Sequence, residues 1–508
     1  MRTVCLDGNN LKISDVVDIA KGNAKAGYDE KTKERIVKCR NFVESILDDE
    51  KPVYGINTGF GMLSDVQVAH ENLEELQINL IRSHAIGVGD PFDRETVRAI
   101  MVLRANVLAK GYSGITLETF DKLIELINKD IIPFIPSQGS VGASGDLAPL
   151  SHLALVLCGE GFVLDTAGKR VDTAQILKEK GIMPITLKAK EGLALINGTQ
   201  VMTAVGILAV NRCRNLLKLA DIAVTSTIEA TLGTDRAFDR KVQMVRGHLG
   251  QMEVAENVLK LILGSEIRED HRCCTKVQDA YSIRCAPQVH GAVRDAVRHA
   301  ANVIETEINS STDNPLIFPD EKETISAGNF HGEPVGLVMD YMAAAISELG
   351  SISERRIEQL INPVFSQSPA FLVKDKGLNS GFMIAHVAAA SLVSENKSLC
   401  FPATVDSIPT SAGKEDHVSM GTIAARKCGQ IVDNCVKVIC MEIFTAMQGL
   451  DFRKPLKPAK AIEEVYNLIR ESVPFMEHDS FLYPMFMDVL ENEYKIVEAA
   501  ENITGILN

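Results

Sequence analysis

Apolar residues recur at three- and four-residue steps along almost the whole chain, and this helical period is the feature that most restricts its fold. The segments Thr96 to Gly111 and Glu118 to Asp130 are clear examples, and the second closes before Pro133. Alternating strand patterns are scarce. The sequence therefore predicts a mainly α protein.

Two longer segments are expected to form a long central helical bundle. Glu333 to Ile361 has a helical pattern for many turns, and its first half is apolar on more than one face, as a helix surrounded by other helices requires. Pro363 marks its end. Gly381 to Leu399 has the same character, with alanines that let neighbouring backbones approach closely.

Domain boundaries are only weakly marked, because the 508 residues contain no low-complexity linker and no internal repeat of fixed period. We expect a mixed N-terminal portion over residues 1–200 that carries the active-site loops, a central long-helix bundle over residues 201–450 and a C-terminal helical portion over residues 451–508. These three portions could also belong to one continuous fold.

Charge and composition favour a protein that handles small molecules. A net charge of -14 and a pI of about 5.4 disfavour a nucleic-acid partner. The N-terminus has charges where a signal peptide needs an apolar core, and no segment is an uninterrupted apolar membrane span. The eleven cysteines form no C-x-x-C pair. We expect a soluble cytoplasmic protein with reduced thiols and no membrane partner.

The stretch GSVGASGDLAPLSH, Gly139 to His152, places three glycines ahead of an apolar helix and so invites a comparison with a phosphate loop. A phosphate loop needs a lysine at the start of the helix, whereas this chain has Asp146 and Leu147. The serine-hydrolase pattern G-x-S-x-G also fails, because Gly142 to Gly145 is one residue too short. Neither interpretation fits.

The small residues on either side of Ser144 suggest another chemistry. If the nitrogen of Gly145 attacks the carbonyl of Ala143, the backbone closes into a five-membered ring, which bulky neighbours would obstruct. Loss of water from the ring and from the Ser144 side chain then leaves an alkene conjugated to a carbonyl, a strong electrophile. For an isolated Ala-Ser-Gly, the alternative is a helix N-terminus capped by Ser144 or Asp146.

The complete motif resembles the signature of the aromatic amino acid ammonia-lyases, in which Ala-Ser-Gly becomes 4-methylideneimidazol-5-one (MIO). The resemblance covers nearly the full chain and is strongest to the histidine-specific branch of that family. It implies that Ala143, Ser144 and Gly145 form the MIO group, that no external cofactor and no metal are needed, and that a homotetramer forms sites from three subunits.

Matching local motifs carry the family's site residues onto this chain. They are Tyr54 in YGINTGFG, His84 in RSHAIG, Asn197 in LINGTQ, Gln278, Tyr281 and Arg284 in VQDAYSIRCAPQ, Phe330 in GNFHGEP and Glu415 in EDHVSMG. The resemblance implies catalytic roles for Tyr54, Ser144, Tyr281 and Glu415. It implies substrate-binding roles for His84, Asn197, Gln278, Arg284, Phe330 and Glu415.

These residue types suit the removal of ammonia from an α-amino acid. The guanidinium of Arg284 can hold a carboxylate bidentately, and Asn197 can donate from its amide. Tyr54 is the family's base for the β-proton, which requires a lowered pKa, and helix N-termini converging on the site would lower it. His84 and Glu415 together can hold the two imidazole nitrogens of histidine.

We therefore expect non-oxidative deamination of L-histidine to trans-urocanate and ammonia. The alternatives are an ammonia-lyase or aminomutase acting on tyrosine or phenylalanine, and a helical-bundle relative without catalysis. Two positions differ from the family pattern: Phe401 stands where histidine is expected, and Lys414 stands where bacterial relatives usually carry glutamine. A lysine at this position could pair with Glu415 and lower its basicity.

Overall fold

The computed structural model describes residues 1–47, 52–272 and 276–508, and it is mainly α, as predicted. The chain forms two compact units, each built from three segments. The first unit comprises Met1–Asn211, Ala300–Asp340 and Pro402–Arg426, and the second comprises Arg212–His299, Tyr341–Phe401 and Lys427–Asn508. The three consecutive portions expected from the sequence divide the chain differently and stay a prediction.

The helices expected from periodicity are confirmed. Helix α15 has the predicted bounds, Glu333–Ile361, and α17 covers Met383–Leu399. Helices α4 (Arg94–Ala109) and α5 (Leu117–Asn128) begin and end within two residues of their predicted positions. The long, strongly periodic segments were therefore the predictable part of the fold.

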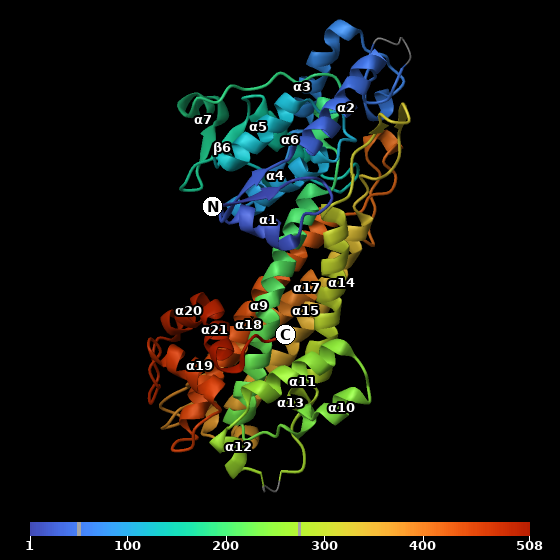
Figure 1. Cartoon of the computed structure of the whole chain (residues 1–508). Helices are drawn as coiled ribbons and strands as arrows, with labels where there is room; N and C mark the ends of the chain where they lie inside the picture. The colour runs from blue at the N-terminus through green and yellow to red at the C-terminus, as the bar shows by residue number, and fades with distance from the viewer. Residues whose placement is uncertain (48–51, 273–275) are drawn as a thin grey trace. The chain divides into compact units, whose positions relative to one another are not determined.

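The first unit is centred on α4, in which every residue from Thr96 to Ala109 is buried. Helices α1, α2 and α5 contact α4 (Figure 1). The other helices of this unit are α1 (Ile13–Ala20), α2 (Glu30–Leu47), α3 (Leu73–His84), α6 (Leu147–Leu157), α7 (Thr173–Lys180) and α8 (Glu191–Ile196). Because α4 is surrounded on all sides, it is apolar around most of its circumference.

All nine strands of the described chain are short and lie in the first unit. They are β1 (Arg2–Cys5), β2 (Ala24–Gly27), β3 (Val88–Pro91), β4 (Ile132–Pro133), β5 (Pro136–Gln138), β6 (Phe162–Leu164), β7 (Arg170–Asp172), β8 (Leu316–Phe318) and β9 (Glu323–Ile325). β1 pairs in parallel with β2, with Arg2 opposite Ala24. The pairs β3-β5 and β8-β9 and the sheet β4-β6-β7 are antiparallel.

Four long helices contain the boundaries between the units: α9 (Gln200–Ala230), α14 (Ala286–Ile308), α15 and α18 (Gly421–Asp451). The remaining helices of the second unit are α10 (Arg240–Met244), α11 (Leu249–Leu261), α12 (Glu266–Asp270), α13 (Tyr281–Arg284), α16 (Pro363–Ser366), α17, α19 (Lys460–Arg470), α20 (Leu482–Glu491) and α21 (Glu493–Thr504). An apolar cluster packs α9 against α11 through Val224, Ile228, Ala255 and Val258.

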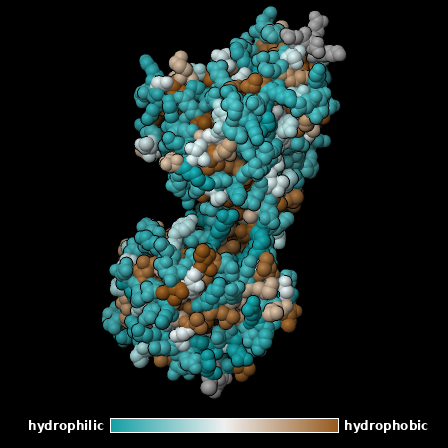
Figure 2. All heavy atoms as spheres, in the orientation of Figure 1, coloured by the Kyte–Doolittle hydropathy of each residue, from teal (hydrophilic) through white to brown (hydrophobic). Residues whose placement is uncertain are grey.

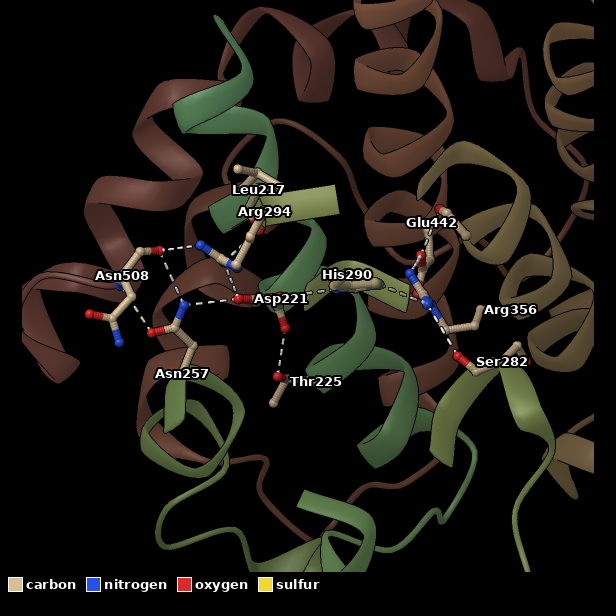
Figure 3. Close-up of polar contacts among 11 residues, drawn as sticks. Leu217, Asp221, Thr225, Asn257, Ser282, His290, Arg294, Arg356, Glu442 and Asn508 are labelled. Carbon is tan, nitrogen blue, oxygen red and sulfur yellow. Dashed lines mark hydrogen bonds and ion pairs between the residues drawn. The ribbon is translucent and has the colours of Figure 1, made fainter. Parts of the chain in front are cut away.

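A buried ionic network joins the long helices inside the second unit (Figure 3). Arg356 of α15 donates to both carboxylate oxygens of Glu442 of α18, at 2.6 and 2.8 Å. Its Nη1 also donates to Nε2 of His290 on α14, whose Nδ1 donates to Asp221 of α9. Burial by itself raises the pKa of Asp221, but the charge of Arg294 and the hydrogen bond from His290 bring it below the ordinary value.

Helix α15 is the one helix of the described residues that is long and apolar enough to cross a membrane, judged by length and composition. Its most apolar window is 56% buried within the chain, as in a helix of a protein core. This agrees with the expectation of a central bundle helix.

Candidate active site

The Ala143-Ser144-Gly145 loop lies between β5 and α6 and depends on backbone contacts that only glycine permits. Gly145 has φ +74°, and a Cβ added there would lie 2.2 Å from the carbonyl oxygen of Gly198. The two glycines form an isolated parallel bridge, and the amide of Asp146 donates to the same Gly198 oxygen at 2.8 Å. The small residues of the motif therefore have a steric reason in addition to the chemical one.

Helix N-termini converge beside this loop, as the expected chemistry requires. Asp146 precedes α6, and its buried carboxylate accepts from the backbone amides of Val201 and Met202 in the first turn of α9, at 2.9 and 3.0 Å. Thr422, in the first turn of α18, donates to the other carboxylate oxygen. Burial raises the pKa of Asp146, and these hydrogen bonds work in the opposite direction.

Ser144 and Glu415, 271 positions apart in sequence, are in direct contact. The Ser144 hydroxyl donates to Oε1 of Glu415 at 3.0 Å. The hydroxyl of Thr410 donates to Oε2 at 2.7 Å, and a backbone bridge also joins Thr410 to Glu415. The carboxylate is thus held at both oxygens and faces the predicted reactive serine.

A cavity of about 650 Å³ opens at this contact. Its lining includes four of the predicted residues, Tyr54, Ser144, Phe330 and Glu415. Burial raises the pKa of Tyr54 above its ordinary value of 10.0, and the negative charge of Glu415 adds to the increase. The lowered pKa expected of a tyrosine base concerns the complete site and stays a prediction.

Asn197 ends α8 directly before Gly198 and is buried. Its backbone oxygen accepts from the fully buried Arg104 at 2.7 Å, and its side-chain Oδ1 has no hydrogen-bond partner among the described residues. Burial lowers the pKa of Arg104 to about 10. A polar side chain without a partner is thus held next to the residue that contacts Gly145.

His84 is the last residue of α3 and does not line this cavity in the described chain. Its Nδ1 lies 2.8 Å from the carbonyl oxygen of Leu80, which can only accept, so Nδ1 carries the ring proton. The ring nitrogen Nε2 is consequently left as an acceptor.

The three predicted residues Gln278, Tyr281 and Arg284 belong to the second unit and are not among the residues lining the cavity of the first. Gln278 is exposed and Tyr281 is 70% exposed. The guanidinium carbon of Arg284 lies 4.4 Å from the centre of the Tyr281 ring, and its Nε has no hydrogen-bond partner among the described residues. These side chains are therefore available to a further group.

Comparisons with known proteins agree with this geometry. The family model for aromatic amino acid lyases matches residues 11–471. The chain belongs to the aromatic amino acid lyase family. It is 54% identical over 485 residues to the histidine ammonia-lyase of Caldanaerobacter subterraneus subsp. tengcongensis, covering 95% of each chain.

Two solved structures of relatives are also similar to this chain. The crystal structure of histidine ammonia-lyase from Trypanosoma cruzi is 43% identical with a TM-score of 0.91, over 99% of this chain and 95% of that one. Tyrosine aminomutase from Streptomyces globisporus is 36% identical with a TM-score of 0.94, over the whole of both chains. The predicted family and fold class are thus confirmed.

Lys414 and Phe401, the two positions that differ from the family pattern, lie in different environments. Lys414 lines the cavity, and no ion pair joins it to Glu415 among the described residues. The Glu415 oxygens instead accept from two hydroxyls. Phe401 is 74% exposed in the second unit.

Sequence reasoning missed two residues that hold the site of this family member together. Asp146 was considered only as a helix cap, and Thr410 was not considered. Asp146 could have been noticed in the sequence, because a charged residue there directly follows the glycine loop. The structure shows that this position is fully buried. No local pattern marks Thr410, because its partner Glu415 reaches it through a turn.

Proposed function

We propose that this chain is a carbon–nitrogen lyase that converts L-histidine to trans-urocanate and ammonia. The observation that carries the proposal is the contact between Ser144, in an intact Ala-Ser-Gly loop, and Glu415 across a cavity. Support comes from relatives named histidine ammonia-lyase that are 48–54% identical over at least 94% of this chain.

We further propose that Ala143, Ser144 and Gly145 form the MIO group by ring closure and loss of two water molecules. Two features fit this group: Gly145 has no space for a side chain, and the buried Asn197, whose side-chain NH2 can donate a hydrogen bond, directly precedes Gly198, the residue that contacts Gly145. MIO supplies an electron sink for the amino acid, whose β-hydrogen is barely acidic and whose ammonia is a poor leaving group.

Glu415 changes its environment when the ring forms. The Ser144 hydroxyl that donates to Oε1 is lost as water, whereas Thr410 continues to hold Oε2. Oε1 is then free to accept from a substrate N–H at the place where the hydroxyl was. This supports the role of Glu415 in holding the imidazole ring. Nε2 of His84 is the second predicted contact, and because it is also an acceptor, the two contacts together fit a substrate ring that carries a proton on both nitrogens.

The chain's other residues bind the substrate and move protons in this proposal. Arg284 holds the carboxylate, and Gln278 and Phe330 complete the binding surface. Tyr54 takes the β-proton, and Tyr281 assists the departure of ammonia. Since burial raises the pKa of Tyr54 in the single chain, its action as a base requires positive charge that arrives with the substrate or with a partner subunit.

A homotetramer in the cytoplasm is proposed for this protein. Gln278 and Tyr281 are exposed in the single chain, whereas the reaction needs both residues in an enclosed site, and this supports the proposal. Large apolar side chains are exposed on α17 as well, including Ile384 and Val387. A partner subunit would cover both groups of residues.

The test is to incubate the purified full chain with histidine, tyrosine and phenylalanine and to follow the conjugated product by absorbance. Histidine should be the preferred substrate, and the intact mass should be lower than the translated sequence by two water molecules. Ser144→Ala should have the full mass and almost no activity. Conjugated product formed mainly from tyrosine or phenylalanine would support the alternative of an ammonia-lyase acting on those amino acids, and an active protein of full mass would contradict the role of MIO.

A further inference from the structure

Two histidines and a glutamate form a cluster beside the segments that line the cavity. Glu333 is the first residue of α15, His331 lies two positions before it, and His417 lies in the segment before α18. Each residue offers one ligand atom, and the three atoms lie within 4.8 Å of one another. The rings of His331 and His417 stack with their centres 5.6 Å apart.

Hydrogen bonds hold the His331 ring in an orientation that suits a metal ligand. Its Nε2 lies 3.3 Å from the carbonyl oxygen of His417, an acceptor only, so Nε2 carries the proton and Nδ1 keeps its lone pair. Nδ1 lies 4.0 Å from Oε2 of Glu333. Histidine ligands commonly donate their second N–H to a backbone carbonyl, which fixes the ring, and His331 already has this contact.

Glu333 supplies a negative charge to this cluster. Its Oε2 is a buried atom without a hydrogen-bond partner among the described residues, which costs free energy. Among the described residues, the one hydrogen bond to Nδ1 of His331 that competes with a metal is the long one of 3.3 Å from the Glu333 amide. The positive end of α15 disfavours a cation, but the Glu333 carboxylate in its first turn offsets that effect.

We propose that His331, Glu333 and His417 bind a divalent transition-metal ion of the Zn²⁺ class. Two imidazole nitrogens and one carboxylate oxygen are ligands that Zn²⁺, Co²⁺ and Ni²⁺ accept, and a fourth position stays open for water. Around Zn²⁺ such atoms lie about 3.3 Å apart, since each bond is about 2.0–2.2 Å long. The exposed His417 side chain and Glu333 can close the remaining distance.

This ion would connect two walls of the cavity without taking part in the proposed reaction. His331 follows Phe330 directly, and His417 lies two positions after Glu415; both Phe330 and Glu415 line the cavity. A bound ion would therefore hold the two segments together. No metal-binding pattern is visible in the sequence, because the two histidines are 86 positions apart.

Cobalt titration of the metal-free full chain tests the proposal independently of activity. We expect one Co²⁺ per chain, with ligand-field absorption bands and no thiolate-to-cobalt charge transfer. His417→Ala should lose this equivalent, and Glu333→Gln should weaken binding at least about 10-fold. His478→Ala is the control, because His478 is exposed in the second unit and outside the cluster.

Further variants distinguish a failure of the metal-site proposal from a failure of the proposed enzyme function. Ser144→Ala should bind Co²⁺ as the wild type does, because its side chain is not part of the cluster. The thermal unfolding midpoint of each variant shows whether it has folded. Equal Co²⁺ uptake by the wild type and a folded His417→Ala would overturn the assignment, as would a thiolate spectrum that persists in Glu333→Gln.

Discussion

At the scale of single residues, Gly145 shows how closely the Ser144 loop is fitted to its surroundings. We predict that Gly145→Ala fails to form the MIO group, because the added Cβ would lie 2.2 Å from the Gly198 oxygen and φ is +74°. Intact mass should show the full translated value, and activity should be lost. Gly168→Ala is the matched control: its φ is +76°, but nothing lies within 4 Å of the added Cβ.

The Gly168→Ala control separates the effect of backbone strain from the effect of the steric contact with Gly198. Gly168→Ala carries the cost of a left-handed alanine, about 1–2 kcal/mol, but should keep the mass loss of two water molecules and the activity. A Gly145→Ala protein that also loses two water molecules would show that the loop can move away from Gly198 and that the steric argument is wrong.

Substrate choice also belongs to single residues. If Nε2 of His84 and Oε1 of Glu415 hold the imidazole nitrogens, His84→Phe should cost about 1–3 kcal/mol in kcat/KM for histidine, because one ring nitrogen loses its partner. His84→Phe combined with Glu415→Gln should shift preference towards phenylalanine further than either change alone. Unchanged histidine turnover in His84→Phe would rule out this contact.

At the scale of elements, Glu229 near the end of α9 links the packing of the second unit to pH. It accepts from the amide of Ala459, directly before α19, and from Ser265, the residue that caps α12. Burial raises its pKa from 4.5 to about 7, and these hydrogen bonds oppose the shift. The folded protein therefore keeps a proton on Glu229 that the unfolded chain loses above pH 4.5.

This shift predicts that Glu229→Gln stabilises the protein more at high pH than at low pH. Between about pH 5 and about pH 8 the wild type loses stability relative to the variant, by on the order of 3 kcal/mol. Urea unfolding of both proteins across that range measures the difference. Glu498→Gln, on the exposed side of α21, should show no such trend, and a flat difference for Glu229→Gln would contradict the raised pKa.

At the scale of the whole molecule, the proposed site requires residues of both units in one place. On the face shown in Figure 2, hydrophobic patches interrupt a mainly hydrophilic surface, as expected for a protein whose copies associate. If Arg284 of one subunit serves Ser144 of another, co-expressed Ser144→Ala and Arg284→Ala chains should regain part of the activity that each lacks alone. Activity of the purified hybrids measures this recovery.

The control for this experiment combines two variants of the same unit. Ser144→Ala with Asn197→Ala should give no recovery, because both residues belong to the loops around Gly198 in one chain. Absence of recovery in the Ser144 and Arg284 pair, with hybrids shown to form, would mean that a single chain supplies both residues.

The sequence by itself determined the helices and the reacting loop. The bounds of α15 followed from periodicity, since a 29-residue apolar pattern ended by a proline has few alternatives. The ring closure at Ser144 could be predicted because its neighbours Ala143 and Gly145 are small. The family could be predicted for the same reason, because its motifs are contiguous in sequence.

Only the tertiary structure decided which distant side chains meet. The contact of Ser144 with Glu415, the burial of Asp146 between helix N-termini and the cluster of His331, Glu333 and His417 join residues far apart in the chain. Burial likewise raises the pKa of Tyr54 in the single chain. Periodicity and motifs describe near neighbours, whereas contact, desolvation and charge depend on how the whole chain packs.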